Sequence, residues 1–296
     1  MTNNRVLLFI RKCSPAFNLA LGIGLWALIK FAFSQIFSAD AVKQAILLIS
    51  LYVVFAVAYI FTIKKIGTLQ ITGLSNKNLL KSTIFMIPTV ALGIVLSIFT
   101  IQAIKRLGIE YSSSAFVGDL PSILCGFAET IFIQEVIIVG FLSAFHHRCS
   151  KTQWNTILIS TIGGLALGVF LMFSSNLTDY KQILFQIFAS IVLALVWVKY
   201  RNQIIFPVQF LGLNSYMLII FAIANASKSI LFVDEKYASQ INWCLIIGII
   251  ANALTALFMI LTLKYPIPKK KILYSKKTID SEGNETVETE AFIVKK

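Results

Sequence analysis

Two glutamates and a glutamine interrupt a hydrophobic stretch at residues 123–145, whose sequence is ILCGFAETIFIQEVIIVGFLSAF. They are Glu129, Gln134 and Glu135. Ionisable groups inside a membrane are energetically costly, so their positions are candidates for a functional site. On a helix, six residues turn about 240° past a full rotation, so Glu129 and Glu135 point to different faces and form no acid pair. Gln134 and Glu135 lie about 100° apart, and both could border one internal cavity.

Nucleophilic and metal-binding side chains are scarce in this sequence. The two histidines of the chain, His146 and His147, follow this stretch directly, and Cys149 lies two residues further on. A cysteine and a histidine can act as nucleophile and base, but two residues apart on a loop they indicate catalysis only weakly. The four cysteines are scattered and show no CxxC spacing. We therefore expect no disulfide, no metal and no cofactor.

Long apolar stretches must position these residues. The chain has 296 residues, of which 57% are hydrophobic and only 13% charged, and a soluble domain of this size cannot bury so much apolar surface in one core. About 20 apolar residues cross a hydrocarbon core of roughly 30 Å, and the stretches lack the alternation of barrel strands. The sequence predicts an all-α fold, a polytopic helical bundle in the cell membrane. Its eight expected spans are Ala16–Phe37, Gln44–Ile63, Ser82–Ile104, Ile123–Phe145, Trp154–Ser174, Gln182–Val198, Phe206–Ala226 and Ile241–Leu263.

The basic residues predict how this bundle is oriented. With the N-terminus in the cytoplasm, nineteen of the 26 Lys and Arg residues fall inside, six fall outside, and Lys30 lies within the first span. This distribution follows the positive-inside rule and predicts that both ends of the chain are cytoplasmic. It also accounts for the net charge of +13 without nucleic acid, which we do not expect as a partner.

The composition divides the chain into a transmembrane bundle at residues 1–265 and a tail at 266–296. The tail alternates charges and has too little apolar sequence for a core, so we expect it to be flexible and cytoplasmic. Two interpretations of its basic first half stay open. It either contacts anionic lipid headgroups through Lys269, Lys270 and Lys271, or it is a stop-transfer flank with no further role.

The segment QEVIIVGFLSAFHHRCSKTQWNTILIS resembles the first motif of the CAAX-protease and bacteriocin-processing (Abi) family of intramembrane metalloproteases. Active members of that family carry Glu-Glu-x-x-x-Arg-Gly in this span, then a basic loop, a Trp and a span with a Ser-rich start and Phe-x-x-x-His. A later span adds a His that is followed four residues on by Asn or Asp. The resemblance extends over residues 123–226, which corresponds to the family's core region.

Within the fourth span, the resemblance keeps some motif residues and loses others. Glu135 matches the second glutamate and Gly140 the glycine, whereas Gln134 replaces the first glutamate and Val139 the arginine. The family's chemistry needs a carboxylate to activate water. Glutamine cannot take a proton, so this half of the implied site is incomplete.

The histidine positions of the later spans are also occupied by other residues. In ISTIGGLALGVFLMF that position falls at Gly168 or Phe170, and in FPVQFLGLNSY it falls at Phe210, although Pro207 and Asn214 fit. The family's imidazoles hold a metal or polarise the scissile carbonyl, and no histidine occurs after residue 147. The resemblance therefore implies a degenerate, non-catalytic member, similar to the lysostaphin-resistance-protein branch with its eight spans and charged tail.

The polar residues inside the spans allow two interpretations. Either a protonated Glu135 hydrogen-bonds with Gln134, Asn214 or a backbone carbonyl and ties the bundle together, or these residues line a retained pocket that recognises a peptide or lipid. Glu129 is expected to meet water at the outer boundary. Lys30 and Asp119 either snorkel or form salt bridges.

From the resemblance we expect a non-catalytic membrane scaffold or regulator of the bacterial cell envelope. Its expected partners are membrane lipids and a membrane or cell-wall enzyme that it binds and controls. Three alternatives stay open: a bacteriocin immunity protein, a transporter or permease subunit, and an active intramembrane protease that uses an unfamiliar residue set. Transporters tend to contain internal repeats and broken helices, and this chain has helix-breaking residues but no visible repeat.

Overall fold

Long helices form almost all of the part of the chain that the structure describes. The computed structural model describes residues 9–10, 13–36, 41–66, 78–106, 108, 113–174, 179–212, 235–267, 271–279 and 285–293. Its helices are α2 (Ser14–Ala27), η1 (Leu28–Ala32), η2 (Phe33–Gln35), α3 (Ala41–Ile66), α4 (Leu79–Ile84), α5 (Ile87–Arg106), α6 (Ser113–Gln134), η4 (Glu135–Leu142), α7 (Ser143–Cys149), α8 (Gln153–Ser174), α9 (Tyr180–Tyr200) and α12 (Glu235–Thr262).

Six helical segments are long and apolar enough to cross a membrane. The chain is therefore a multi-pass membrane protein, as the sequence predicts. Two of these segments join consecutive helices, because α2 continues into η1 and α6 continues through η4 into α7. The six segments are Ser14–Ala32, Val42–Ile66, Leu124–Cys149, Gln153–Ser174, Tyr180–Tyr200 and Ser239–Thr262.

The other two expected spans are not among these six. The stretch expected at residues 82–104 divides into α4 and α5, and the apolar helix Ile87–Phe99 is shorter than a full span. Pro88 explains the division, because proline has no N–H to donate to the carbonyl of Ile84 one turn earlier. Of the stretch expected at 206–226, the structure describes helix only as far as residue 212.

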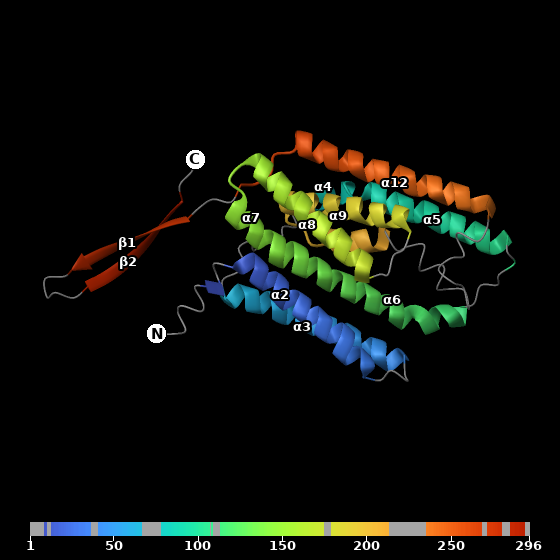
Figure 1. Ribbon diagram of the computed structural model, residues 1–296, viewed down its shortest axis with the longest axis horizontal. Helices are drawn as coiled ribbons and strands as arrows, with labels where there is room; N and C mark the ends of the chain where they lie inside the picture. Colours follow the sequence, from blue (N-terminus) through green and yellow to red (C-terminus); the bar gives the residue numbers. More distant parts are fainter. Residues whose placement is uncertain are drawn as a thin grey trace.

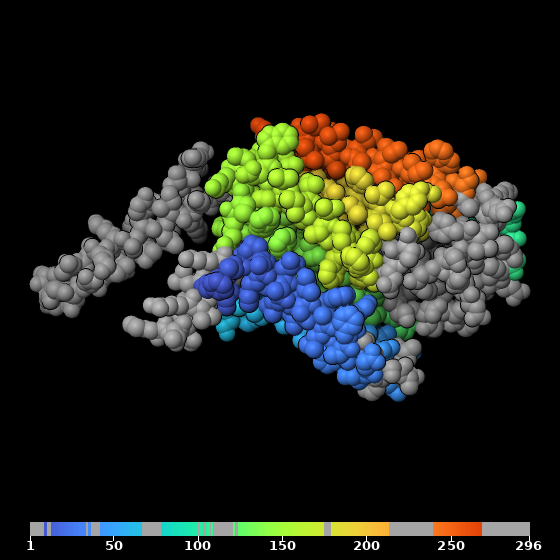
Figure 2. Space-filling model, in the orientation of Figure 1, coloured from blue at the N-terminus to red at the C-terminus, as the bar shows by residue number. Residues whose placement is uncertain are grey.

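The helices form a bundle with α6 near its centre. Figure 1 shows α2 and α3 along one side of α6, and α8, α9 and α12 on the other side, with α5 beside α12. Figure 2 shows the N-terminal helices, then α7 and α8, then α12 across the visible face. This order joins segments far apart in the sequence, since α3 packs on α6 and α5 packs on α12.

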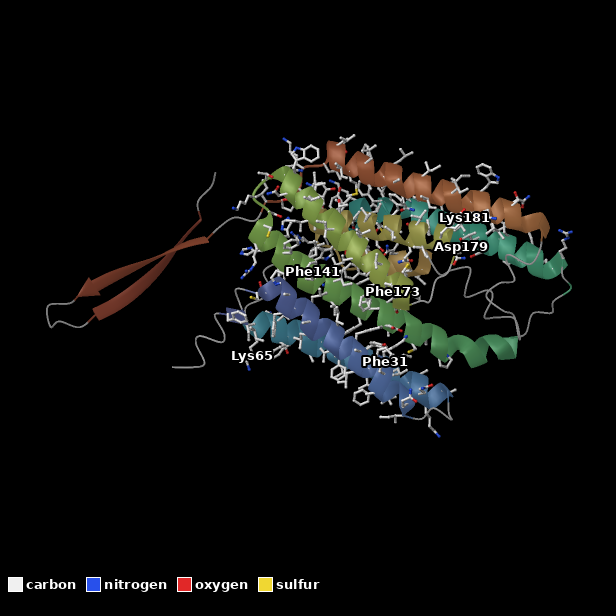
Figure 3. The ribbon with its side chains drawn as sticks, in the orientation of Figure 1. Phe31, Lys65, Phe141, Phe173, Asp179 and Lys181 are labelled. Atoms are coloured by element: carbon white, nitrogen blue, oxygen red, sulfur yellow. The ribbon has the colours of Figure 1, made fainter. Side chains whose placement is uncertain are left out.

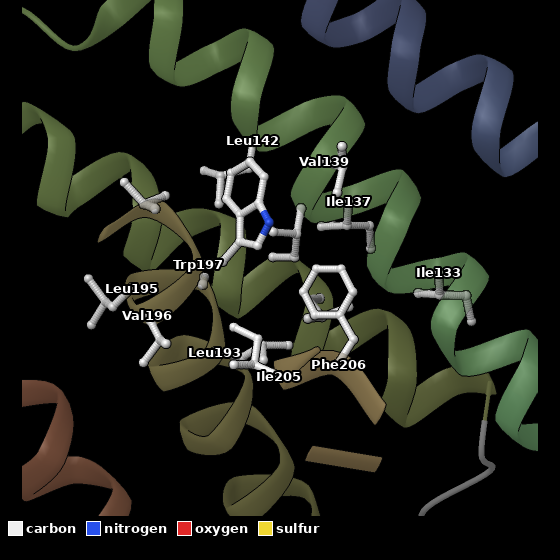
Figure 4. Packing of buried hydrophobic residues seen from close by; sticks show 14 of the residues in the cluster. Ile133, Ile137, Val139, Leu142, Leu193, Leu195, Val196, Trp197, Ile205 and Phe206 are labelled. Atoms are coloured by element: carbon white, nitrogen blue, oxygen red, sulfur yellow. The ribbon is translucent and has the colours of Figure 1, made fainter. Parts of the chain in front are cut away.

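The core lies between η4, α8, α9 and the helix that begins at Ile205. Figure 4 shows the Trp197 indole near Leu142, with Phe206 close to Ile137. All four side chains belong to one buried cluster. Since lipid is as apolar as this core, close packing holds such helices together more than exclusion from water does.

Basic residues mark the end of the bundle at which α2 begins and α12 ends. Lys64 and Lys65 lie in the last turn of α3, Arg148 in that of α7 and Lys199 in that of α9. Figure 3 shows Lys65 toward this end and Lys181 toward the opposite one. We call the first of these the terminal end.

The tail contains secondary structure that its composition did not predict. Strands β1 (Lys271–Ile279) and β2 (Glu285–Ile293) form an antiparallel pair in which Lys271 lies opposite Ile293. An isolated two-stranded ribbon is only marginally stable in water, so the flexibility of the tail stays a prediction. Of the three lysines expected to contact lipid, Lys269 and Lys270 lie outside the described residues, and only the backbone of Lys271 is described.

Candidate functional site

The candidate site begins where α6 changes from an α-helix to a π-helix. Gln134 is the last residue of α6, and Glu135 is the first of η4, an eight-residue π-helix. π-Helical turns are rare and frequently occur at functional sites. The wider turn changes which backbone carbonyls are paired within the helix, so side chains from neighbouring helices can reach them.

Three helices meet at the backbone of η4. The Asn18 side chain of α2 donates to the carbonyl of Gly140 over 2.9 Å, and the Tyr59 hydroxyl of α3 donates to the carbonyl of Asn18 over 3.0 Å. The same hydroxyl lies 3.5 Å from the carbonyl of Val136. A Cβ atom at Gly140 would overlap this hydroxyl. Gly140 therefore has a packing role that does not depend on the family motif it matches.

Gln134 forms one hydrogen bond, with a residue that the sequence did not single out. Its amide nitrogen donates to the Gln209 side-chain oxygen over 2.9 Å, and both residues are fully buried. The Gln134 oxygen and the Gln209 nitrogen have no partner among the described residues. Gln209 directly precedes Phe210, and the one available signal was a single glutamine within an apolar stretch.

Glu135 places a carboxyl group beside these polar contacts. One of its oxygens is buried and has no hydrogen-bond partner in the described part of the chain. Tyr59 lies within electrostatic range of this carboxyl. Gln134, Glu135, Gln209 and Tyr59 thus bring amide, carboxyl and hydroxyl groups to the start of η4, which fits hydrogen bonding to a polar group.

Glu129 belongs to a separate network, and the expectation that it meets water is wrong. It is only 7% exposed, and its carboxylate accepts from Trp26 Nε1 over 2.9 Å and from Ser174 Oγ over 3.0 Å. The Lys30 ammonium lies 3.0 Å from the Glu129 carboxylate and forms an ion pair with it. Of the two interpretations of Lys30, snorkelling and a salt bridge, the structure shows the salt bridge. The apolar neighbourhood explains the pairing, because a buried carboxylate needs a counter-charge and donors. The side chain of Asp119 lies outside the described residues.

Packing residues occupy the other motif positions. A Cβ atom at Gly168 would lie 2.7 Å from the Cα atom of Ile187 in α9, so a histidine does not fit there. Phe170 packs edge-on against Trp26 with ring centroids 4.9 Å apart, and Phe210 packs in the same way against Phe127 at 4.9 Å. Val139 is buried in the core, and Asn214 lies outside the described residues.

The two histidines and Cys149 follow this site in the sequence and lie at the terminal end of the bundle. His146 is fully buried, whereas His147 and Cys149 are exposed at the end of α7. Across the described ranges, no group of three or more His, Cys, Asp or Glu residues is placed to hold a metal ion.

The fold defines the class as a polytopic helical membrane protein with a polar site at a π-helical turn. Comparisons with models of protein families, with curated proteins and with solved structures found no match to this chain. The resemblance to the CAAX-protease and bacteriocin-processing family therefore stays a prediction from the motif residues.

Proposed function

We propose that the protein is a non-catalytic membrane scaffold or regulator of the bacterial cell envelope, related to the CAAX-protease and bacteriocin-processing family. On this proposal it binds and controls a partner membrane or cell-wall enzyme. The proposal rests on one observation: residues that pair or pack between helices occupy positions where the family's motif has catalytic residues. Gln134 is paired with Gln209, and Gly168 and Phe210 are committed to helix packing.

Packing of this kind supports a binding role, because catalysis by the family's mechanism needs a base and imidazoles. Glu135 is the one motif carboxylate that remains, and the only histidines of the chain precede the expected fifth span. A polar turn with a carboxyl oxygen that has no partner among the described residues suits recognition of a polar group on a partner helix. Interhelical hydrogen bonds in membranes stabilise association by about 0.6–2 kcal/mol each.

The topology that accompanies this proposal has eight spans with both termini in the cytoplasm. On this topology, α4 and α5 together make the third crossing, and the helix that begins at Ile205 starts the seventh. The basic last turns of α3, α7 and α9 support a cytoplasmic terminal end, because such charges are retained on that side.

A cleavage assay combined with complementation tests the proposal. The purified protein, incubated with prenylated and leader peptides, should release no product above the level of a Glu135→Ala preparation. In a deletion strain with an envelope defect, Glu135→Gln should restore growth as well as the wild type does, because glutamine keeps the shape and hydrogen bonding of the carboxyl. Cleavage that disappears in Glu135→Ala would contradict the proposal.

Partner binding needs a second measurement. In-cell crosslinking followed by purification in mild detergent should yield one stoichiometric membrane or cell-wall enzyme. Glu135→Leu should reduce its recovery, whereas Thr161→Val, a matched loss of one polar group that bonds only within its own helix, should not. Recovery of the protein alone would count against a scaffold.

A further inference from the structure

Polar atoms without partners gather at the terminal end of the bundle. His146 in α7 is fully buried, and Ser150, Trp197 and Tyr265 are 6%, 3% and 4% exposed. Both ring nitrogens of His146, the Ser150 hydroxyl, Trp197 Nε1, one terminal nitrogen of Arg201 and the Tyr265 hydroxyl have no hydrogen-bond partner among the described residues. Buried polar groups are rarely left unpaired. We call these five residues the end cluster.

The backbone positions the cationic member of this cluster. Arg201 has a left-handed conformation with φ of 58°, and its N–H donates to the Trp197 carbonyl over 2.8 Å. This turn folds the guanidinium over the Trp197 ring, with its central carbon 4.6 Å from the ring centroid. Stacking fixes the plane of the guanidinium and leaves its edge available for hydrogen bonds.

Two members of the cluster come from the end of α7. The Ser150 N–H donates to the His146 carbonyl over 2.9 Å, so the hydroxyl follows the imidazole by one helical turn. Arg201 acts electrostatically on His146, which means that the ends of α7 and α9 lie close together. η4, which continues directly into α7, contributes Leu142 to the same buried core as Trp197 of α9.

Tyr265 is held against this region by two neighbouring helices. Gln153 at the start of α8 accepts from the Tyr265 N–H over 3.1 Å and donates to the Leu263 carbonyl over 3.1 Å. The Lys199 ammonium of α9 donates to the Lys264 carbonyl. Burial raises the pKa of the Tyr265 hydroxyl, and Tyr200 adds to this shift. The hydroxyl therefore keeps its proton and can donate it.

Positive charge dominates the surroundings of the end cluster. Burial lowers the pKa of Arg201 to about 10, which still leaves it charged at neutral pH. The helix ends next to the cluster carry Arg148, Lys151, Lys199 and Lys264, and no carboxylate belongs to these helix ends in the described part of the chain. Arg201 as a whole is partly exposed, but a cation with a buried, unpartnered N–H and no counter-charge is costly. An anion with several acceptor oxygens would supply the missing charge and accept from the donors.

We propose that the end cluster binds a phosphate group, carried either by an anionic lipid headgroup or by a free phosphate ion. Arginine suits this ligand because its fork of N–H groups matches two phosphate oxygens. The Tyr265 and Ser150 hydroxyls and the His146 ring supply further donors. The site lies at the ends of membrane-spanning helices, the depth at which headgroup phosphates occur. The proposal does not depend on the scaffold function or on the tail lysines.

Thermal stability of the full-length purified protein in neutral detergent tests this site. Two probes are titrated separately: phosphatidylglycerol, with phosphatidylcholine as its zwitterionic control, and inorganic phosphate, with chloride as its control. Phosphate binding should raise the melting temperature of the wild type. A shift with phosphatidylglycerol alone identifies a headgroup site, and a shift with inorganic phosphate identifies a site for the free ion.

Variants locate the shift. Arg201→Asn removes the guanidinium but keeps a residue that tolerates φ above zero, and it should raise the half-maximal probe concentration about tenfold or more. Lys151→Asn removes the same charge from an exposed position nearby and should change it less than threefold. Tyr265→Phe removes one hydroxyl at nearly constant volume and should raise the half-maximal probe concentration about threefold. This variant tests the site if Arg201→Asn does not fold. No shift with either probe, or equal losses in Arg201→Asn and Lys151→Asn, would overturn the proposal.

Discussion

Gln134 and Gln209 pair through one amide contact while each keeps a second amide atom without a partner in the described chain. Asn252 has a similar place in the bundle, where its side-chain oxygen lies 3.1 Å from the Thr89 hydroxyl and its nitrogen donates to the Gly248 carbonyl. Such contacts specify which helix faces meet, because apolar faces alone pack almost equally well in several rotations. Polar residues in these spans therefore determine the register between helices.

A double-mutant cycle measures the Gln134 contact. Gln134→Leu should destabilise the protein by about 1–2 kcal/mol, because it leaves the Gln209 amide buried without its partner. Gln209→Leu should cost a similar amount, and the double variant should cost less than the sum of the two. Reversible unfolding in mixed micelles gives these values. The control, Thr161→Val, should change stability by less than 0.5 kcal/mol, a rough bound for groups outside such pairs, and strict additivity would mean that the amides do not interact.

Helix α8 shows how small residues set the spacing between elements. A Cβ atom at Gly164 would overlap the backbone of Ile191, and one at Gly168 would meet Ile187. These glycines are four residues apart, so they lie on one face of the helix and form a GxxxG surface against α9. The family motif, whose histidine position falls at Gly168 or Phe170, does not indicate this packing.

Two glycines allow a matched test of this packing. Gly168→Ala should destabilise the protein by about 1–3 kcal/mol, because the clash involves backbone atoms that cannot rotate away. Gly126→Ala should be neutral or stabilising by up to about 1 kcal/mol, since nothing lies within 4 Å of a Cβ atom there and alanine favours a helix. Melting temperatures of the two variants provide the comparison. Equal effects would mean that α8 and α9 are not held by close contact.

At the scale of the whole molecule, the ends of the bundle differ in charge and in the chain segments they present. The terminal end carries Lys64, Lys65, Arg148 and Lys199 in last turns of helices. The opposite end has the basic pair Lys105 and Arg106 in the last turn of α5, but it also carries acidic residues, with Glu235 at the start of α12 and Asp179 as the N-cap of α9. An asymmetry of this kind orients a polytopic protein during insertion.

Cysteine labelling tests the proposed orientation. In a background without the other cysteines, Cys149 at the terminal end should react with a membrane-impermeant maleimide only after the cells are opened. Ser239→Cys, an exposed position near the start of α12, should react in intact cells. Denatured samples of both variants should label fully, which controls for loss of the protein. Labelling of Cys149 in intact cells would reverse the proposed topology.

The sequence by itself determined the class of this protein, because apolar stretches of about 20 residues match the thickness of a bilayer's hydrocarbon core. It also predicted that Glu129 and Glu135 would not act together, since helical geometry alone separates them. The division of one apolar stretch into α4 and α5 at Pro88 has a local cause, a missing N–H, that the length of the stretch alone does not show.

Only the tertiary structure decided which polar groups meet. The pairing of Glu129 with Lys30 joins residues 99 positions apart, and that of Gln134 with Gln209 joins residues 75 apart. The end cluster likewise assembles from the ends of α7, α9 and α12. No periodicity in the sequence specifies these contacts, because they depend on how each helix is rotated and how closely its glycines let a neighbour approach. Glu129, Gln134 and Glu135 thus divide between a salt-bridge network at Glu129 and a separate polar turn at Gln134 and Glu135.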